Sequence, residues 1–222
     1  MTSNKKNKKK KNICVVVASR ANYGRIKSTL KAIKKHPKLQ LQLIVSASAL
    51  LDRFGSVVKI IKKDGFYINS SVHIVIEGEN PMTMAKSTGL AIIELTTIFK
   101  NIKPDFVLTV ADRYETMATA IAASYMNIPL VHTQGGEVTG SIDESVRHAI
   151  TKLAHIHFPS TAKSVKRLIK MGENKKFIFN VGCPSIDTLK KQKLSIKHLK
   201  DLKKGVGGNI NLNNPYLLVI QH

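Results

Sequence analysis

Three carboxylates follow short apolar runs of the sequence, in positions suited to a general acid or base. Asp112 comes directly after Phe106–Val110, and Glu137 and Asp143 follow the run Leu130–His132. A positioned carboxylate can take a proton from a substrate or return one to it. If the ends of these two apolar runs meet at one edge of a sheet, the sequence predicts an acid/base site there.

Each of these residues also has a purely structural interpretation. Asp112 can cap the following helix with Arg113 as its ion-pair partner, and for Asp112 alone the cap is the favoured interpretation. Asp143 can stabilise the positive end of a helix dipole and pair with Arg147 one turn further on. The recurrence of carboxylates after several strands favours a site.

Basic residues follow the first apolar run, Ile13–Ser19. Arg20, Gly24 and Arg25 are expected in a short loop before a helix that starts at Arg25, where backbone N–H groups and guanidinium groups can bind an anion. The loop lacks the glycine patterns of dinucleotide and ATP sites, so no cofactor is predicted. A solvated basic loop is an equal alternative.

The elements that must position these residues alternate between strand-like and helix-like patterns. The predicted strands are Ile13–Ser19, Leu39–Ala47, Val72–Ile76, Phe106–Val110, Leu130–His132, Ile156–Phe158 and Phe177–Val181. The predicted helices are Arg25–Lys35, Ser56–Lys63, Pro81–Lys100, Tyr114–Met126, Asp143–Leu153 and Ala162–Met171. This alternation predicts an α/β fold, a Rossmann-like parallel sheet with helices on both faces, whose ligands bind beyond the carboxyl ends of the strands.

Composition divides the chain into four parts. Residues 1–12 are expected to be a disordered basic tail and residues 13–189 a Rossmann-like N-terminal domain. Residues 190–214 have the composition of a linker, and residues 215–222 are expected to be the first strand of a truncated C-terminal nucleotide-binding domain. The apolar run after the tail is too short to span a membrane.

The formal net charge of +22 raises the question of a polyanion partner. The lysines are spread over predicted helix surfaces, and no nucleic-acid-binding motif accompanies them, so this interpretation ranks last. Neither a nucleic-acid nor a membrane partner is predicted. The two cysteines, Cys14 and Cys183, form no metal-ligand pattern and suggest a reduced, cytoplasmic protein.

Five segments together resemble a known family. The segments are SRANYGR at 19–25, ADRYE at 111–115, HTQGGEVTGSIDESVRHAITKLAHIHF at 132–158, NVGCPSIDTL at 180–189 and YLLVIQH at 216–222. The sequence resembles the hydrolysing, non-phosphorylating UDP-N-acetylglucosamine (UDP-GlcNAc) 2-epimerases of sialic-acid biosynthesis. The resemblance implies the N-terminal half of a glycosyltransferase-B-like two-domain fold. It also implies elimination of UDP and then addition of water to give N-acetylmannosamine.

The resemblance also assigns roles to residues of this chain. Asp112 and Asp143 match acid/base positions of the family. The residues that match nucleotide or phosphate contacts, or are expected to bind substrate, are Arg20, Gly24, Arg25, Arg113, Arg147 and His222.

Two positions depart from the family pattern. Gln134 stands where several relatives have an acid/base glutamate, and an amide cannot exchange protons at ordinary pH. Glu137, three residues on, is the candidate to replace it. Arg25 stands where many relatives have lysine, which keeps the charge but changes the geometry of the donors.

Two other functions stay open at this point. One is a UDP-diacetamido-sugar 2-epimerase for legionaminic-type acids, with the same chemistry and a different sugar pocket. The other is a catalytically inactive nucleotide-sugar-binding fragment, which Gln134 and the early end of the sequence favour. A homo-oligomer is expected of the complete protein, and these residues alone are expected to lack activity.

Overall fold

The computed structural model describes residues 9–190 together with 214, 215, 217 and 219. Contacts divide the chain into two units, 1–189 and 190–222, and the architecture below is that of the first. The predicted tail lies mostly outside the described residues, as do nearly all of the predicted linker, most of the predicted strand at 215–222, and His222.

The first unit is a six-stranded parallel sheet in the order β3-β2-β1-β4-β5-β6. The strands are β1 (Lys11–Val17), β2 (Leu39–Ser46), β3 (Ser70–Val72), β4 (Phe106–Val110), β5 (Leu130–Thr133) and β6 (Ile156–Phe158). The order reverses between β1 and β4, and the carboxyl side of such a reversal is where open parallel sheets bind ligands. The predicted fold class is confirmed.

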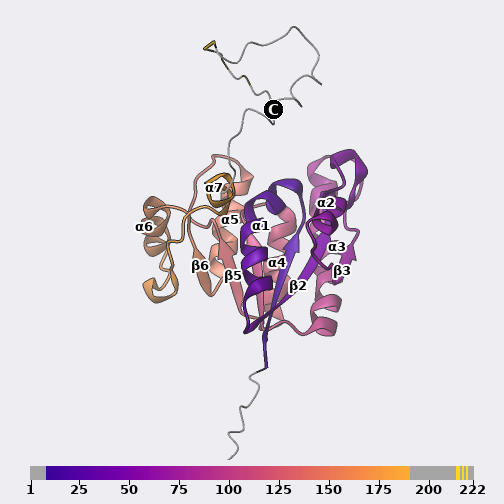
Figure 1. Ribbon diagram of the computed structural model, residues 1–222, viewed down its shortest axis with the longest axis horizontal. Helices are drawn as coiled ribbons and strands as arrows, with labels where there is room; N and C mark the ends of the chain where they lie inside the picture. Colours follow the sequence, from indigo (N-terminus) through magenta and orange to yellow (C-terminus); the bar gives the residue numbers. More distant parts are fainter. Residues whose placement is uncertain (1–8, 191–213, 216, 218, 220–222) are drawn as a thin grey trace, which may run out of the picture. The chain divides into compact units, whose positions relative to one another are not determined.

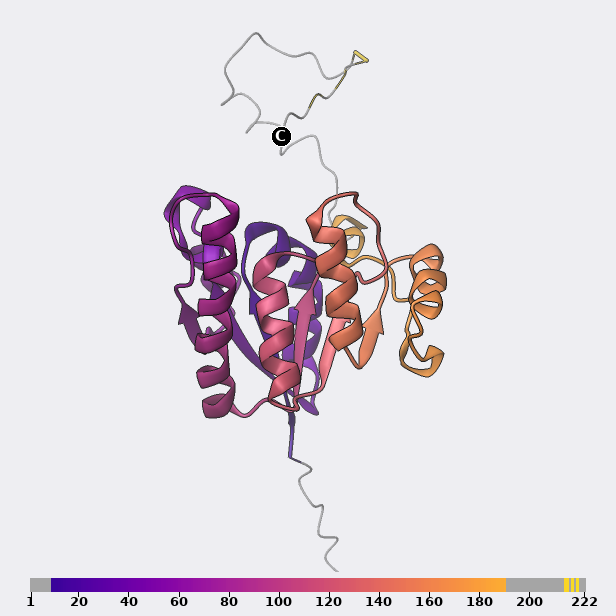
Figure 2. The same ribbon diagram turned by 180° about the vertical axis from the view of Figure 1, so that it is seen from behind.

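Helices cover both faces of this sheet (Figures 1 and 2). The helices are α1 (Arg20–Lys35), α2 (Val57–Lys63), α3 (Pro81–Ile102), α4 (Tyr114–Tyr125), α5 (Ile142–Leu153), α6 (Ala162–Lys170) and α7 (Pro184–Lys190). Short 3₁₀ helices add Ala47–Leu50, Asp52–Phe54 and Lys175–Phe177. Figure 2 shows α3, α4 and α5 side by side on one face, while α1 lies on the face seen in Figure 1.

Alternate residues of the strands supply two separate cores. On β1, Cys14 and Val16 face the core shared with α3, α4 and α5, while Val15 and Val17 face the core shared with α1 and α2. Because a strand covered on both faces needs apolar residues at successive positions, the unbroken apolar run of β1 follows directly from the fold.

Helix α1 begins at Arg20, so the predicted loop over residues 20–24 is wrong. Ser19 caps the helix: its hydroxyl accepts a hydrogen bond from the N–H of Asn22 at 3.1 Å. The Asn22 side chain in turn accepts from the N–H of Ala18 at 3.3 Å. The Ser19 cap satisfies a backbone N–H group of the first turn that a loop would leave to solvent or ligand, which favours a helix start at Arg20. Gly24 therefore lies within the helix.

The predicted strand Phe177–Val181 is also wrong. Residues 175–177 form a 3₁₀ helix, and the segment meets the sheet through a single bridge between His157 and Ile178. The neighbouring strand β6 has only three residues, so it offers few backbone groups with which a further strand could pair. In addition, β3 ends at Val72 rather than Ile76, because the N–H of Ile76 bonds to the Ser87 hydroxyl of α3 at 3.0 Å.

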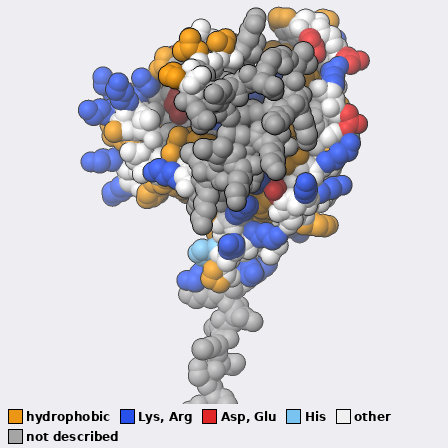
Figure 3. All heavy atoms as spheres, turned by 45° about the horizontal axis from the view of Figure 1, so that its top comes forward, with side chains coloured by type: hydrophobic (Ala, Val, Ile, Leu, Met, Phe, Trp, Pro, Cys, Tyr) orange, Lys and Arg blue, Asp and Glu red, His pale blue; other side chains and the backbone are white. Residues whose placement is uncertain are grey.

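Lysine and arginine side chains are spread around the face of the molecule that Figure 3 shows. On α6 the exposed positions Lys163, Lys166 and Lys170 alternate with the buried Ser164 and Leu168, which face the domain. This is the amphipathic spacing of a surface helix, and it accounts for part of the positive charge.

Candidate active site

Three strands end on a non-glycine residue with left-handed backbone. Ala47 follows β2 with φ of 49°, Ala111 follows β4 with φ of 64°, and Gln134 follows β5 with φ of 61°. The N–H of Ala111 donates to the Thr133 carbonyl at 3.2 Å, and the N–H of Gln134 to the Phe158 carbonyl at 2.9 Å. Backbone strain of this kind clusters at functional sites, and all three residues lie at the carboxyl edge of the sheet.

Asp112 and Arg147 form a buried ion pair at this edge. Their side chains are 13% and 2% exposed, and an Nη2–Oδ2 contact joins them. Nη1 of Arg147 also donates to the Glu137 carbonyl at 2.8 Å. Arg147, from α5, thus ties the loop after β4 to the loop after β5.

Two of the structural interpretations of these residues are wrong, the Asp112 cap and the Arg147–Asp143 pair, whereas Asp143 does lie in the first turn of α5, where it stabilises the helix dipole as expected. Arg113, not Asp112, occupies the N-cap position of α4, with no side-chain cap bond. Arg147 pairs with Asp112 rather than with Asp143, and the hydroxyl of Ser141 accepts the N–H of Asp143 at 3.3 Å to cap α5.

The loop from Gly135 to Gly140 is held from both sides. Glu144 accepts the N–H groups of Thr139 and Gly140 at 2.8 and 2.9 Å, and these bonds hold the pKa of its carboxyl below the usual value. Gly136 has φ of +78°, and a Cβ there would lie 2.7 Å from the Ser164 carbonyl. The close approach of this loop to α6 therefore requires glycine.

Gln134 is buried and fixed by two side chains. Nη1 of Arg25 donates to its amide oxygen at 3.3 Å, and its amide nitrogen lies 3.5 Å from the sulfur of Cys183. The turn around Cys183 at the start of α7 therefore reaches the site. The sequence alone fitted either a turn at the domain edge or a part of the site. The amide here orients neighbours and does not exchange protons.

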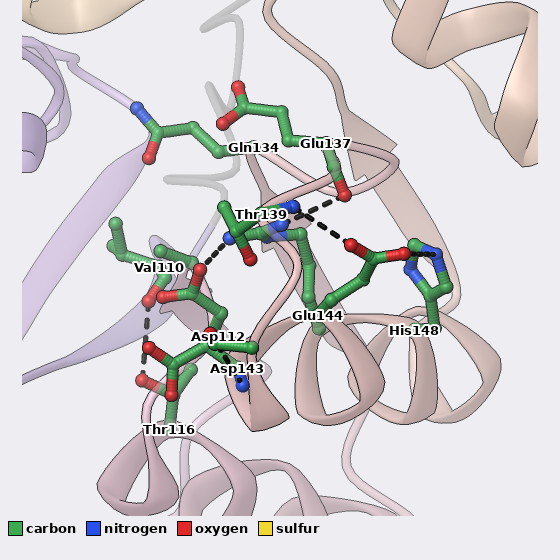
Figure 4. A network of polar contacts seen from close by, with 12 residues as sticks. Val110, Asp112, Thr116, Gln134, Glu137, Thr139, Asp143, Glu144 and His148 are labelled. Carbon is green, nitrogen blue, oxygen red and sulfur yellow. Dashed lines mark hydrogen bonds and ion pairs between the residues drawn. The ribbon is translucent and has the colours of Figure 1, made fainter.

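Four predicted acid/base positions lie in one region. Figure 4 draws them around the loops after β4 and β5, with Gln134 and Glu137 on one side of Thr139 and Asp112 and Asp143 on the other. Asp112, Glu137 and Asp143 are all partly exposed, as an acid or base that must meet a substrate has to be.

The predicted binding residues are more dispersed. Arg20 and Gly24 lie exposed on the first two turns of α1, with the guanidinium of Arg20 next to Gly55. Nε of Arg113 pairs with the Glu115 carboxylate at 3.2 Å. Burial raises the pKa of Glu115, although the charge of Arg113 opposes that shift. The structure does not describe His222.

His132 is a buried residue of the site that the sequence did not single out. Nε2 lies 2.9 Å from the Ala111 carbonyl and Nδ1 lies 3.3 Å from the Thr151 hydroxyl. Since a carbonyl only accepts, Nε2 carries the proton. Burial lowers the pKa of His132 to about 4, so the ring is neutral at pH 7. The His132 ring supports the left-handed turn at Ala111. The signal in the sequence that could have identified this residue was a histidine inside an apolar strand.

Among residues 9–190 and the few described beyond them, no group of three histidine, cysteine or acidic side chains has the arrangement of a metal site. In the same residues no helix combines the length and apolar character needed to cross a membrane.

A family model described as UDP-N-acetylglucosamine 2-epimerase matches residues 31–222. This chain belongs to the UDP-N-acetylglucosamine 2-epimerase family. The family that the sequence motifs predicted is thereby confirmed, and the clustered Asp112, Gln134 and Asp143 belong to the matched region.

Three relatives of this chain illustrate two of the names found in the family. A UDP-N,N'-diacetylbacillosamine 2-epimerase (hydrolyzing) of Legionella pneumophila is 38% identical over 87% of this chain and 51% of its own length. A GDP/UDP-N,N'-diacetylbacillosamine 2-epimerase (hydrolyzing) of Campylobacter jejuni is 35% identical over 96% and 54%. A UDP-N-acetylglucosamine 2-epimerase of Neisseria meningitidis is 32% identical over 86% and 50%. The chain spans about half the length of these curated relatives.

Solved structures of 2-epimerases share the fold. A crystal structure of a UDP-N-acetylglucosamine 2-epimerase superposes with a TM-score of 0.75 at 25% identity, covering 87% of this chain and 55% of that one. The Neisseria meningitidis enzyme bound to UDP-GlcNAc superposes with a TM-score of 0.72 at 22% identity, covering 87% and 52%.

Proposed function

We propose that this chain supplies the N-terminal half of the catalytic site of a hydrolysing UDP-sugar 2-epimerase. The observation that carries the proposal is the Asp112 carboxylate, held by buried Arg147 where the strand order reverses. A carboxylate fixed in this way is oriented before substrate arrives, which favours proton transfer.

The reaction has two steps, each of which needs an acid or a base. First, a carboxylate removes the proton at C2 of UDP-GlcNAc while the bond between C1 and the phosphate oxygen breaks and UDP leaves. A glycal with a C1–C2 double bond remains. Then water adds its oxygen to C1 and a proton is delivered to the opposite face of C2, which gives N-acetylmannosamine.

Asp112 and Asp143 are the proposed acid/base pair, one acting at C2 and the other on the attacking water. Asp112 comes from the loop after β4 and Asp143 from the first turn of α5, so the two groups approach a ligand from different elements. Glu137 is proposed to replace the acid that Gln134 lacks, because it is partly exposed in the same loop and its backbone carbonyl is fixed by Arg147.

Binding of the UDP-sugar is proposed to involve Arg20, Gly24, Arg25 and Arg113, with His222 and a second nucleotide-binding domain completing the cleft. Arg147 is proposed to act through Asp112, since its guanidinium is buried and already engaged. A role in sialic-acid-type sugar biosynthesis, a cytoplasmic location, a homo-oligomer, and inactivity of residues 1–222 alone are parts of the same proposal. No cofactor is needed for either step.

A second candidate substrate is a UDP-diacetamido sugar. It is favoured by the two relatives of 38% and 35% identity, whose names specify N,N'-diacetylbacillosamine. The chemistry at C1 and C2 is unchanged, so the candidate differs only in the sugar pocket.

The test uses the protein expressed from its complete reading frame, incubated in D₂O with UDP-GlcNAc or with UDP-N,N'-diacetylbacillosamine. Elimination and hydration predict release of UDP and a C2-epimerised sugar that carries deuterium at C2. The preferred substrate is the one with the higher kcat/KM. Retention of hydrogen at C2, or no UDP release from either substrate, would contradict the proposed function.

A further inference from the structure

A cavity of about 350 Å³ lies at the same sheet edge and is not used by the network around Asp112. It opens between the segments that follow β2, β3 and β4 and the first turns of α3. Its wall is mostly apolar and includes Phe54, Ile76, Met84 and Tyr114. This volume falls in the range of small-molecule sites, and the combination of an apolar wall with a few polar groups is typical of them.

Two serine hydroxyls in the lining can each form one further hydrogen bond, one as an acceptor and the other as a donor. The Ser48 hydroxyl donates to the Ala18 carbonyl at 3.0 Å, so its oxygen still has room to accept. The Ser87 hydroxyl accepts the N–H of Ile76 at 3.0 Å, and its own proton has no acceptor within the described residues. One free acceptor and one free donor are the complement of a secondary amide.

One of the two arginines in the lining, Arg53, offers no free charge to a phosphate in this cavity. Arg53 is already paired with Glu77 at 2.6 Å and lies 4.0 Å from Glu79, so acidic groups accompany it. Burial raises the pKa of Tyr114 to about 12, which keeps the phenol neutral at pH 7.

Arg113 connects the cavity to the proposed catalytic site. It lines the cavity and follows Asp112 directly in the sequence. Glu115 engages its Nε at 3.2 Å, while its two terminal nitrogens have no hydrogen-bond partner among the residues the structure describes. A ligand whose reacting carbon lies at Asp112 can therefore extend past Arg113 into the cavity.

We propose that this cavity, the α3 pocket, binds an acylamino group of the sugar, with Ser87 donating to its carbonyl and Ser48 accepting from its N–H. The methyl group then packs against Met84 and Ile76. The proposal rests on the proposed function, since it names where part of that substrate binds. It also makes Met84 a residue that determines which sugars fit.

Met84 and Met82 provide a matched pair for the test. Both are exposed methionines in the first turn of α3, and only Met84 lines the pocket. In the complete protein, Met84→Phe should raise KM for UDP-GlcNAc by about tenfold or more, equivalent to losing one good contact. Met82→Phe should leave KM unchanged. Inhibition by the product UDP should be equal in both, because UDP carries no acylamino group.

Ser87→Ala tests the proposed donor independently. It should also raise KM by roughly tenfold, the effect of one neutral hydrogen bond, whereas Thr96→Ala, at an exposed position of the same helix, should not. Thermal unfolding checks that each variant folds. An unchanged KM in a folded Met84→Phe variant, or an equal rise in Met82→Phe, would overturn the assignment.

Failure of the proposed function gives a different result. If the protein releases no UDP, UDP-GlcNAc stays intact, and saturation-transfer NMR then measures its acetyl methyl and uracil protons separately. Methyl saturation that Met84→Phe abolishes and Met82→Phe preserves would support the α3 pocket in a non-catalytic binding protein. Absence of methyl saturation in the unmodified protein would overturn the pocket whatever the uracil signal shows.

Discussion

Arg147 holds the Asp112 carboxylate from a position 35 residues along the chain, and the guanidinium is buried while the carboxylate keeps a small exposed fraction. The same guanidinium binds the Glu137 carbonyl, so a single buried cation sets the position of two neighbouring loops. Removal of either partner from a buried pair leaves an uncompensated charge. Variants at these two positions should therefore separate chemistry from stability.

Asp112→Asn should lower the rate of UDP release by the complete protein by ~10²–10⁴-fold, the usual contribution of a general acid or base. The amide oxygen can still accept from Arg147, so the variant should fold with a reduced melting temperature. Asp105→Asn is the matched control, because Asp105 precedes β4 at the opposite edge of the sheet and binds Lys11. Near-normal turnover in Asp112→Asn would show that the pair is structural only.

Arg147→Met should destabilise the fold by about 3–5 kcal/mol, because it leaves the Asp112 carboxylate unpaired. The double variant Asp112→Asn with Arg147→Met should recover part of that loss, since no charge then stays buried. Urea unfolding of the single and double variants measures the coupling. Additive effects would contradict a direct interaction between the two side chains.

Glu137→Gln should abolish UDP release if Glu137 replaces the acid missing at Gln134, while Gln134→Glu should change the rate only modestly. Glu94→Gln, on the exposed face of α3, controls for the loss of a carboxylate. Full activity of Glu137→Gln would exclude the replacement, and a large gain from Gln134→Glu would indicate an ordinary acid position that this chain has lost.

Two glycines should respond to alanine in opposite directions. Gly24 lies in α1, and a Cβ added there would have no heavy atom within 4 Å apart from its chain neighbours and the backbone of its own helix, so Gly24→Ala should stabilise the fold by ~0.5–1 kcal/mol. Gly136→Ala should destabilise it by more than the roughly 1–2 kcal/mol of a left-handed alanine, because of the added contact with Ser164. If Gly24 admits the phosphates closely, Gly24→Ala should also raise KM. Unchanged KM would remove Gly24 from the binding site.

His132 should make stability depend on pH. Burial lowers its pKa from 6.5 to about 4, so the folded state favours the neutral ring. The associated stability is fully present above pH 6.5 and is lost as the pH falls towards 4, by about 3 kcal/mol. Urea unfolding between pH 7.5 and 4.5 measures this loss. His132→Asn should flatten that part of the profile and the exposed His36→Asn should not, whereas identical profiles for all three proteins would exclude His132 as the cause.

Local sequence patterns predicted the sheet well because each buried strand is a short apolar run between polar turns. The strand Phe106–Val110 has the predicted bounds, and Asp112 lies just beyond it at the sheet edge as expected. The patterns gave wrong boundaries where a hydrogen bond between a side chain and the backbone decides where a helix begins or a strand ends. The Ser19 cap starts α1 five residues before the predicted position, and the bond from Ile76 to Ser87 ends β3 early.

Long-range pairing could not be predicted from spacing. Arg147 and Asp143 are four residues apart on one helix, which suggested a local pair, but Asp112 is the partner that Arg147 meets in the fold. Likewise, the apolar run Phe177–Val181 has a strand-like pattern, but whether it pairs depends on the length of β6. Such outcomes depend on the tertiary arrangement, which a single segment does not encode.

The left-handed residues after β2 and β4 have a consequence for selection experiments. Ala47 and Ala111 carry a β-carbon in a backbone region that disfavours it by roughly 1–2 kcal/mol. A library screened only for heat resistance should therefore enrich glycine at both sites, because neither methyl group forms a polar interaction that would be lost. Gln134, with the same backbone, should resist the change, since its amide contacts Arg25 and Cys183. Substitutions at Ala47 and Ala111 would then change thermostability, while Gln134 would keep the side-chain contacts at the site.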